Sequence, residues 1–237
     1  MPLHTQAAGV RTIVPVSQSD LSTQMADVRS GLVEMASLVL AQVEHAVDAW
    51  EATDRTLATQ VLAQDELVDE RLMDLDRRIF EIHLTHAPLA GDLRLLHVGL
   101  ITAVALERVG DLAVSIARLT ESVPTGASMP RIESIIRRMA ARAVDALARS
   151  VQAIARADAD LGDEASLEAD AVRLMLEDVR AAASEETDEM GRREWITASV
   201  LVARHLERVA NNAAELGGRV RFVATGTPFV RSPRLTT

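Results

Sequence analysis

The sequence predicts an all-α protein made of two tandem three-helix bundles related by internal duplication. Alanine, leucine, arginine and glutamate dominate the chain, and alternation typical of strands is hard to find. The run LERV at residue 106 returns at residue 206, with the same apolar spacing behind it. High helix propensity combined with apolar residues at three- and four-residue intervals is typical of amphipathic helices. A long segment that recurs at a fixed period indicates duplicated units.

Six long helices account for most of the chain. They are expected over residues 20–52, 54–85, 91–121, 131–157, 163–184 and 191–223. Thr53 or Asp54 can cap the second helix, because their side-chain oxygens accept hydrogen bonds from free N–H groups at a helix start. Pro88 and Gly91 mark the turn before the third helix. The predicted organisation is a tail (1–19), a first repeat (20–121), a linker rich in turn formers (122–130), a second repeat (131–226) and a tail (227–237).

Composition excludes several classes of function. The 237 residues carry a net charge of −10 and only 2% are aromatic, which disfavours nucleic-acid binding because that needs a basic surface. Without cysteine the chain has no thiolate nucleophile or cysteine metal site. The longest apolar run, residues 98–106, is too short to cross a bilayer, and the N-terminus lacks a secretory signal. We therefore expect a cytoplasmic protein that is peripheral to a membrane at most.

Paired carboxylates occupy corresponding positions on two neighbouring helices. Glu107 and Asp111 lie one turn apart, on the side of the third helix opposite its apolar stripe. Asp65 and Asp69 have the same spacing on the second helix. In an antiparallel hairpin that turns near Pro88, position 69 lies beside 107 and position 65 beside 111. The sequence therefore predicts four carboxylates across one groove.

Four neighbouring carboxylates repel one another unless a cation neutralises them. A hard cation with oxygen ligands removes this cost, and helix-borne carboxylates build such sites in bundles. Fe(III) is the favoured ion, and Mn, Mg, Ca and Zn are alternatives. None of the six histidines lies three or four residues from these acids, which argues against a di-iron oxidase. No nucleophile and base can be paired and no phosphate-binding glycine loop occurs, so we expect no enzyme activity.

The second half repeats this arrangement incompletely. With a turn near Met190 and Gly191, Asp170 falls opposite Asn211, and Leu174 falls opposite Glu207. Asp170, Glu207 and Asn211 form a degenerate second metal site, so we expect one metal site rather than two. On this reasoning, Glu207→Ala should change metal content and stability little, whereas Asp69→Ala or Glu107→Ala should lower both.

These motifs resemble those of the PhoU family. The family carries D-x-x-x-D on one helix and an L-E-R-I-G-D-x-A-x-x-I-A run on the next, and the chain has Asp65 to Asp69 and LERVGDLAVSIA. HAPLAGDLRLL is similar to the family's inter-helix turn, and ARHLERVANNAAEL to its C-terminal signature. The resemblance covers roughly residues 20 to 226.

The resemblance implies a fold, a set of ligands and a role. It implies two three-helix bundles with metal clusters, for which Asp65, Asp69, Glu107 and Asp111 would be the ligands in repeat one. It implies negative regulation of phosphate uptake and of the phosphate-starvation response, through the Pst phosphate ABC transporter ATPase and a sensor histidine kinase. A homodimer is a further arrangement to test. The alternative is a metal-free helical adaptor or scaffold that uses its acidic face for protein docking.

Overall fold

The computed structural model describes residues 18–124, 128–185 and 190–227, and these residues contain six α-helices and no strand. The helices are α1 (Gln18–Ala52), α2 (Arg55–Thr85), α3 (Gly91–Ser122), α4 (Pro130–Arg156), α5 (Ala159–Ser184) and α6 (Met190–Thr225). The prediction of an all-α fold is therefore confirmed. Most of each expected tail (residues 1–17 and 228–237) and part of the expected linker (residues 125–127) lie outside the described residues.

The link between the first two helices of each repeat is built in the same way. Asp54 and Asp158 each accept hydrogen bonds from two backbone N–H groups in the first turn of the next helix. The residues before them, Thr53 and Ala157, both have left-handed backbone angles, with φ of 53° and 54°. The expected start of the fifth helix at Asp163 is wrong, because the cap at Asp158 starts α5 at Ala159.

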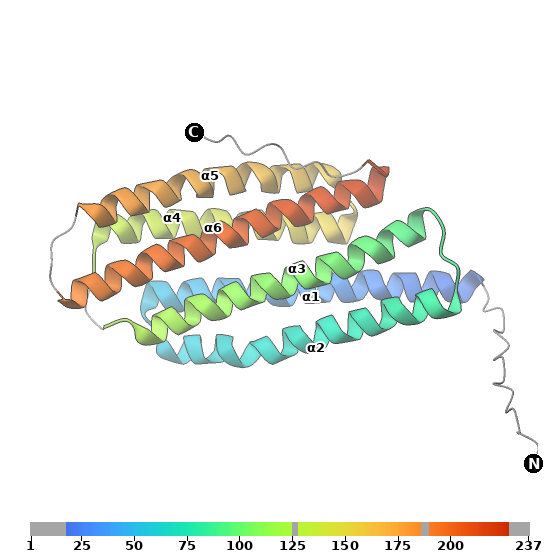
Figure 1. Ribbon diagram of the computed structural model, residues 1–237, viewed down its shortest axis with the longest axis horizontal. Helices are drawn as coiled ribbons and strands as arrows, with labels where there is room; N and C mark the ends of the chain where they lie inside the picture. Colours follow the sequence, from blue (N-terminus) through green and yellow to red (C-terminus); the bar gives the residue numbers. More distant parts are fainter. Residues whose placement is uncertain (1–17, 125–127, 186–189, 228–237) are drawn as a thin grey trace, which may run out of the picture.

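The two bundles lie along each other with their helices near the long axis of the molecule (Figure 1). Helices α1, α2 and α3 pack together in one bundle and α4, α5 and α6 in the other. The bundles meet where α1 contacts α4 and α3 contacts α6. One continuous cluster of buried apolar side chains runs through both. None of the described helices has the length and apolarity needed to span a membrane.

Side chains at one end of the bundles also join the two repeats. Trp50 of α1 and Trp195 of α6 stack with their ring centroids 6.3 Å apart. Glu51, which follows Trp50 in the chain, accepts a hydrogen bond from Arg137 of α4 at 3.3 Å. Both tryptophans are buried, so they act as packing anchors between the two repeats.

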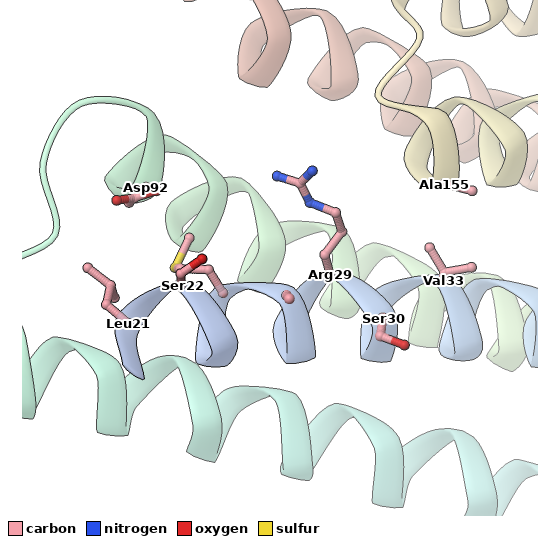
Figure 2. A pocket seen from close by; sticks show the side chains of 9 residues that line it. Leu21, Ser22, Arg29, Ser30, Val33, Asp92 and Ala155 are labelled. Atoms are coloured by element: carbon pink, nitrogen blue, oxygen red, sulfur yellow. The ribbon is translucent and has the colours of Figure 1, made fainter. Parts of the chain in front are cut away.

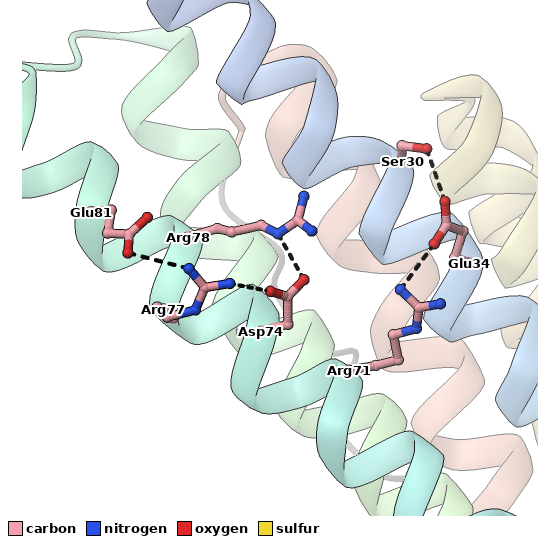
Figure 3. Close-up of polar contacts among 7 residues, drawn as sticks. All are labelled: Ser30, Glu34, Arg71, Asp74, Arg77, Arg78 and Glu81. Carbon is pink, nitrogen blue, oxygen red and sulfur yellow. Dashed lines mark hydrogen bonds and ion pairs between the residues drawn. The ribbon is translucent and has the colours of Figure 1, made fainter.

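Ion pairs on the surface of α1 and α2 add little to this core. Arg71 of α2 reaches Glu34 of α1 at 3.2 Å, and Asp74 pairs with Arg77 and Arg78 along α2 (Figure 3). The arginines are 41–60% exposed, and exposed pairs of this kind contribute about 1 kcal/mol or less each. The fold therefore depends on helix packing rather than on these contacts.

Two helix backbones of the second bundle come into direct contact at a pair of glycines. A Cβ atom on Gly162 of α5 would lie 2.5 Å from the backbone oxygen of Gly217 of α6, and the converse holds for Gly217. Real Cβ atoms do not approach backbone oxygens so closely. Glycine at both positions therefore allows the two backbones to touch.

Candidate metal centre

The structure places the four carboxylates of repeat one on the neighbouring helices α2 and α3, near enough for their charges to interact. We call Asp65 and Asp69 of α2 with Glu107 and Asp111 of α3 the carboxylate cluster. Burial raises the pKa of Asp65, and repulsion from Asp69 and Asp111 raises it further. Burial, followed by repulsion from Asp111 and Asp69, likewise raises the pKa of Glu107. The charges of the acids on α2 and α3 therefore interact across the hairpin.

The cluster is not neutralised by close ion pairs. Within the described part of the chain, no arginine or histidine lies within 4 Å of a carboxylate oxygen in the cluster. Arg118 lowers the pKa of Asp65, and Arg108 lowers that of Glu107, but in each case the raising causes prevail. Repeat one thus holds a concentration of negative charge that a cation would relieve.

The donor set suits a hard cation. Carboxylate oxygens from two facing helices are ligands that Fe(III), Mn and Mg accept, and the raised pKa values show the electrostatic cost that such an ion would remove. In residues 18–124, 128–185 and 190–227, however, no three His, Asp or Glu side chains converge as in a formed metal site. Metal binding by the cluster therefore stays a prediction.

A buried amide behind the cluster has no counterpart in the motifs read from the sequence. Gln42 of α1 is fully buried, and its Nε2 donates to the backbone oxygen of Val61 at 3.3 Å. Hydrogen bonding from the Gln42 side chain lowers the pKa of Asp65. A single glutamine among apolar residues gives no sequence signal. The one indication in the sequence is the glycine of the LERVGD run, Gly110, because a larger residue there would crowd the amide. A Cβ atom on residue 110 would lie 3.0 Å from Gln42 Oε1.

The second repeat neutralises its carboxylates internally. Glu207 is 6% exposed and accepts hydrogen bonds from Arg204 and from Asn211, both at 2.6 Å. Asp170 has an exposed side chain and pairs with Arg173 at 3.2 Å. Each of these acids therefore has a guanidinium partner, which the acids of repeat one lack among the described residues.

The burial pattern corrects the alignment of the two repeats. Buried positions of α2 recur in α5 with a spacing of 104 residues: Ala58 and Gly162, Val61 and Ala165, Val68 and Val172, Leu75 and Val179. On this register Ala169 stands in the place of Asp65, and Arg173 in the place of Asp69. Asp170 corresponds to the exposed Glu66. The expected match of Asp170 with Asp65 is thus shifted by one residue.

A separate groove of about 720 Å³ lies between the bundles, near the start of α1. Figure 2 shows Arg29 of α1 extending into it, with Asp92 of α3 and Ala155 of α4 at its borders. The two charged side chains have opposite signs. The groove therefore has no marked preference for an anion or a cation.

Comparison with known proteins finds similarity to PhoU proteins along most of the chain. Residues 32–120 match the model of the PhoU domain. The "Phosphate-specific transport system accessory protein PhoU homolog" of Pseudomonas aeruginosa is 27% identical over 218 residues, which cover 87% of this chain and 86% of the relative. A relative of the same description from Thermotoga maritima, homolog 1, is 25% identical over 84% of this chain and 86% of its own length.

Solved structures extend this similarity to the fold. The crystal structure of PhoU from Pseudomonas aeruginosa superposes with a TM-score of 0.81 and 26% identity, over 87% of this chain and all of the other. The phosphate transport system regulatory protein PhoU from Streptococcus pneumoniae has a TM-score of 0.79 at 17% identity, over 89% of this chain and 99% of the other. The second comparison concerns the fold alone.

Proposed function

The chain belongs to the PhoU family, and on that premise we propose that it is an accessory regulator of a phosphate-specific transport system. The observation that carries this proposal is similarity to PhoU proteins over 87% of the chain, through both bundles. The continuous helical core and the acidic surface suit a protein that works through contacts with other proteins. We infer that its role is regulatory rather than catalytic.

In this proposal the protein acts on the cytoplasmic side of the membrane. It restrains phosphate uptake and the phosphate-starvation response by connecting the ATPase of a phosphate ABC transporter to a sensor histidine kinase. Asp65, Asp69, Glu107 and Asp111 would hold the metal ion of repeat one. A bound ion would supply positive charge between α2 and α3 and so stabilise the hairpin. The raised pKa values of Asp65 and Glu107 support this part.

Genetic complementation tests the regulatory role. Deleting the gene should raise expression of a phosphate-starvation reporter in phosphate-rich medium, and the parent gene should restore repression. A chain carrying Glu107→Ala should restore it poorly, whereas Glu66→Ala is a matched control, since Glu66 is exposed and outside the cluster. Unchanged reporter expression after deletion would contradict the proposed role.

A metal-free adaptor is the second candidate function. It is favoured by the absence of three converging ligands in the described part of the chain, and by the internal neutralisation of Glu207. An adaptor of this kind should bind the transporter ATPase equally well with and without a chelator. Loss of that binding in the chelator, restored by added metal, would favour the metal-dependent form.

A further inference from the structure

Helix α2 exposes a line of large apolar side chains to solvent. Met73, Phe80 and Leu84 are 64%, 61% and 60% exposed. At about 100° of rotation per residue they fall within about 40° of one another, so they form one line along the helix. We call these three residues the α2 stripe. Single exposed apolar residues are ordinary, whereas a contiguous group marks a surface that contacts a partner.

The packing of the bundle does not use the α2 stripe. The buried residues in the same part of the helix, among them Leu75, Ile79 and Ile82, lie on its other side. Among the described helices, α2 contacts only α1 and α3. Figure 1 shows α2 along the side of the first bundle that is turned away from the second bundle. The outer face of α2 is therefore unpartnered within the described part of the chain.

The second repeat has the same core positions without the stripe. The spacing of 104 residues that aligns the buried positions of α2 and α5 places Glu177 at the position of Met73, and Ser184 at that of Phe80. Both residues are exposed. The duplicated hairpin therefore folds with polar residues at these positions, so the fold does not explain the apolar residues of α2.

Phe80 is the most informative member of the stripe. The whole chain has three phenylalanines, two tryptophans and no tyrosine. Trp50 and Trp195 are buried, as expected for packing anchors, whereas the ring of Phe80 is left largely in solvent. Aromatic side chains are enriched among the residues that contribute most of the binding energy in protein interfaces. Phe80 therefore suits the centre of a docking surface.

The border of the α2 stripe is acidic. Asp69, Glu70 and Asp76 are exposed and lie within about 60° of the line of the stripe. None of the three pairs with an arginine in the described part of the chain. Arg77 is the single arginine on this face between residues 69 and 84, and it already forms ion pairs with two acids of α2 (Figure 3). Unpaired negative charge thus flanks the apolar line.

This charge selects the occupant of the surface. A second copy of the chain would bring the same acids against one another, and facing like charges oppose association. The headgroups of an anionic membrane would be repelled for the same reason. A basic amphipathic helix complements both features, because its apolar side chains can cover the stripe while its flanking Lys and Arg side chains face the acids.

We propose that the outer face of α2 is a docking site for a basic amphipathic helix of a partner protein, with Phe80 at its centre. This proposal rests on the proposed role as a regulator that works through protein contacts, and it gives the chemistry of one such contact. The partner's apolar side chains pack on the stripe, and its basic side chains pair with the three acids. Asp69 also belongs to the carboxylate cluster, so the docking site is tested without metal.

A synthetic peptide tests the site in the intact protein. The probe has about 21 residues, with leucine at the a and d positions, lysine at e and g, and glutamine elsewhere. In EDTA, fluorescence anisotropy should show that Phe80→Ser weakens its binding about tenfold or more. Leu174→Ser is the matched control on α5, where the leucine is 68% exposed, and should leave the affinity unchanged. No binding to the parent, or equal affinity for the parent and Phe80→Ser, would overturn the proposal.

Charge reversal gives an independent test. The Glu70→Arg, Asp76→Arg double variant should bind the lysine peptide about fivefold or more weakly than the parent does. It should also gain affinity for a peptide with glutamate in place of lysine. Glu177→Arg with Asp178→Arg makes the same change of net charge at exposed positions of α5 and should alter neither affinity. Equal losses in the two double variants would show attraction by net charge alone and would contradict the docking site.

Sedimentation equilibrium tests whether a second copy covers the stripe instead. Phe80→Ser should keep the oligomeric state of the parent. It should also keep the melting temperature of the parent, because substitutions of exposed side chains outside the core change stability little. A parent dimer that Phe80→Ser dissociates would place a second copy on the stripe and overturn the proposal.

The phosphate-starvation reporter separates this proposal from the proposed function. In the deletion strain, Phe80→Ser should restore repression poorly and Leu174→Ser should restore it fully. If deletion leaves the reporter unchanged, the proposed function fails, and peptide binding alone decides whether α2 is a docking site. Full repression by Phe80→Ser in a strain that the parent represses would contradict docking through the stripe.

Discussion

Replacing Glu207 with alanine should destabilise the protein by about 3 kcal/mol, whether or not metal is present. Glu207 accepts a 2.6 Å hydrogen bond from the half-buried Asn211, and a charged hydrogen bond of this kind contributes about 1.5 kcal/mol. The ion pair of Glu207 with Arg204 adds less than about 1 kcal/mol, because the Arg204 side chain is 52% exposed. The buried aliphatic stem accounts for the rest.

Glu107→Ala at the matching position should behave differently. In metal-free protein it removes a charge that its neighbours repel, so the free energy of unfolding should stay equal to that of the parent or rise. With metal bound to the parent, the same substitution should be destabilising. The structure therefore reverses the expectation from sequence that Glu207→Ala changes stability little.

Thermal unfolding followed by circular dichroism, with EDTA and with Mn²⁺, measures both effects. For a chain of this size, Glu207→Ala should lower the melting temperature by about 6–12 °C in both conditions. Glu107→Ala should lower it, relative to the parent, only with Mn²⁺. Equal losses for both variants in EDTA would refute the reasoning that repeat two is neutralised internally and repeat one is not.

Two further predictions concern the charge and the packing of the helices. In EDTA, the parent should lose stability relative to the Asp65→Asn, Glu107→Gln double variant as pH rises above the ordinary carboxyl pKa values of 3.8 and 4.5. The sign follows because a raised pKa in the folded state means that the folded form binds the proton more tightly than the unfolded form. Urea unfolding of the parent and the double variant across this pH range measures the effect. A constant difference in stability between the two proteins would contradict it. Gly162→Ala should cost about 3 kcal/mol or more, because the new methyl group meets the backbone of Gly217. Gly91→Ala is the control, because a Cβ atom there would meet no atom closer than 4.0 Å. Urea unfolding measures both variants, and a similar loss of stability for Gly162→Ala and Gly91→Ala would refute the close contact.

The fold could be predicted because its determinants are local and repeated. Helix propensity, caps such as Asp54 and the recurring LERV run all act within a few residues of their own position. The error at the start of α5 has a local cause as well, since Asp158 caps that helix although its first turn carries no apolar stripe. The contacts of α3 with α6 and of α1 with α4 depend on packing between distant segments, and no sequence period indicates them.

The candidate site was predictable in part for the same reason. Asp65, Asp69, Glu107 and Asp111 follow from helix spacing and one hairpin turn, so their meeting needs only the geometry of two helices. Asp170 was misaligned by one residue because only the burial pattern of α5 fixes its register. Glu207 pairs with Arg204, which lies one turn away on the same helix. Which of the nearby arginines forms this pair depends on side-chain packing.

The central claim is that the cluster in repeat one holds the metal and that repeat two holds none. Elemental analysis of untagged protein tests it most directly, by comparing metal per chain in the parent, Glu107→Ala and Glu207→Ala. The account predicts metal in the parent and in Glu207→Ala, and its loss in Glu107→Ala. No metal in the parent, or an equal loss in both variants, would contradict it.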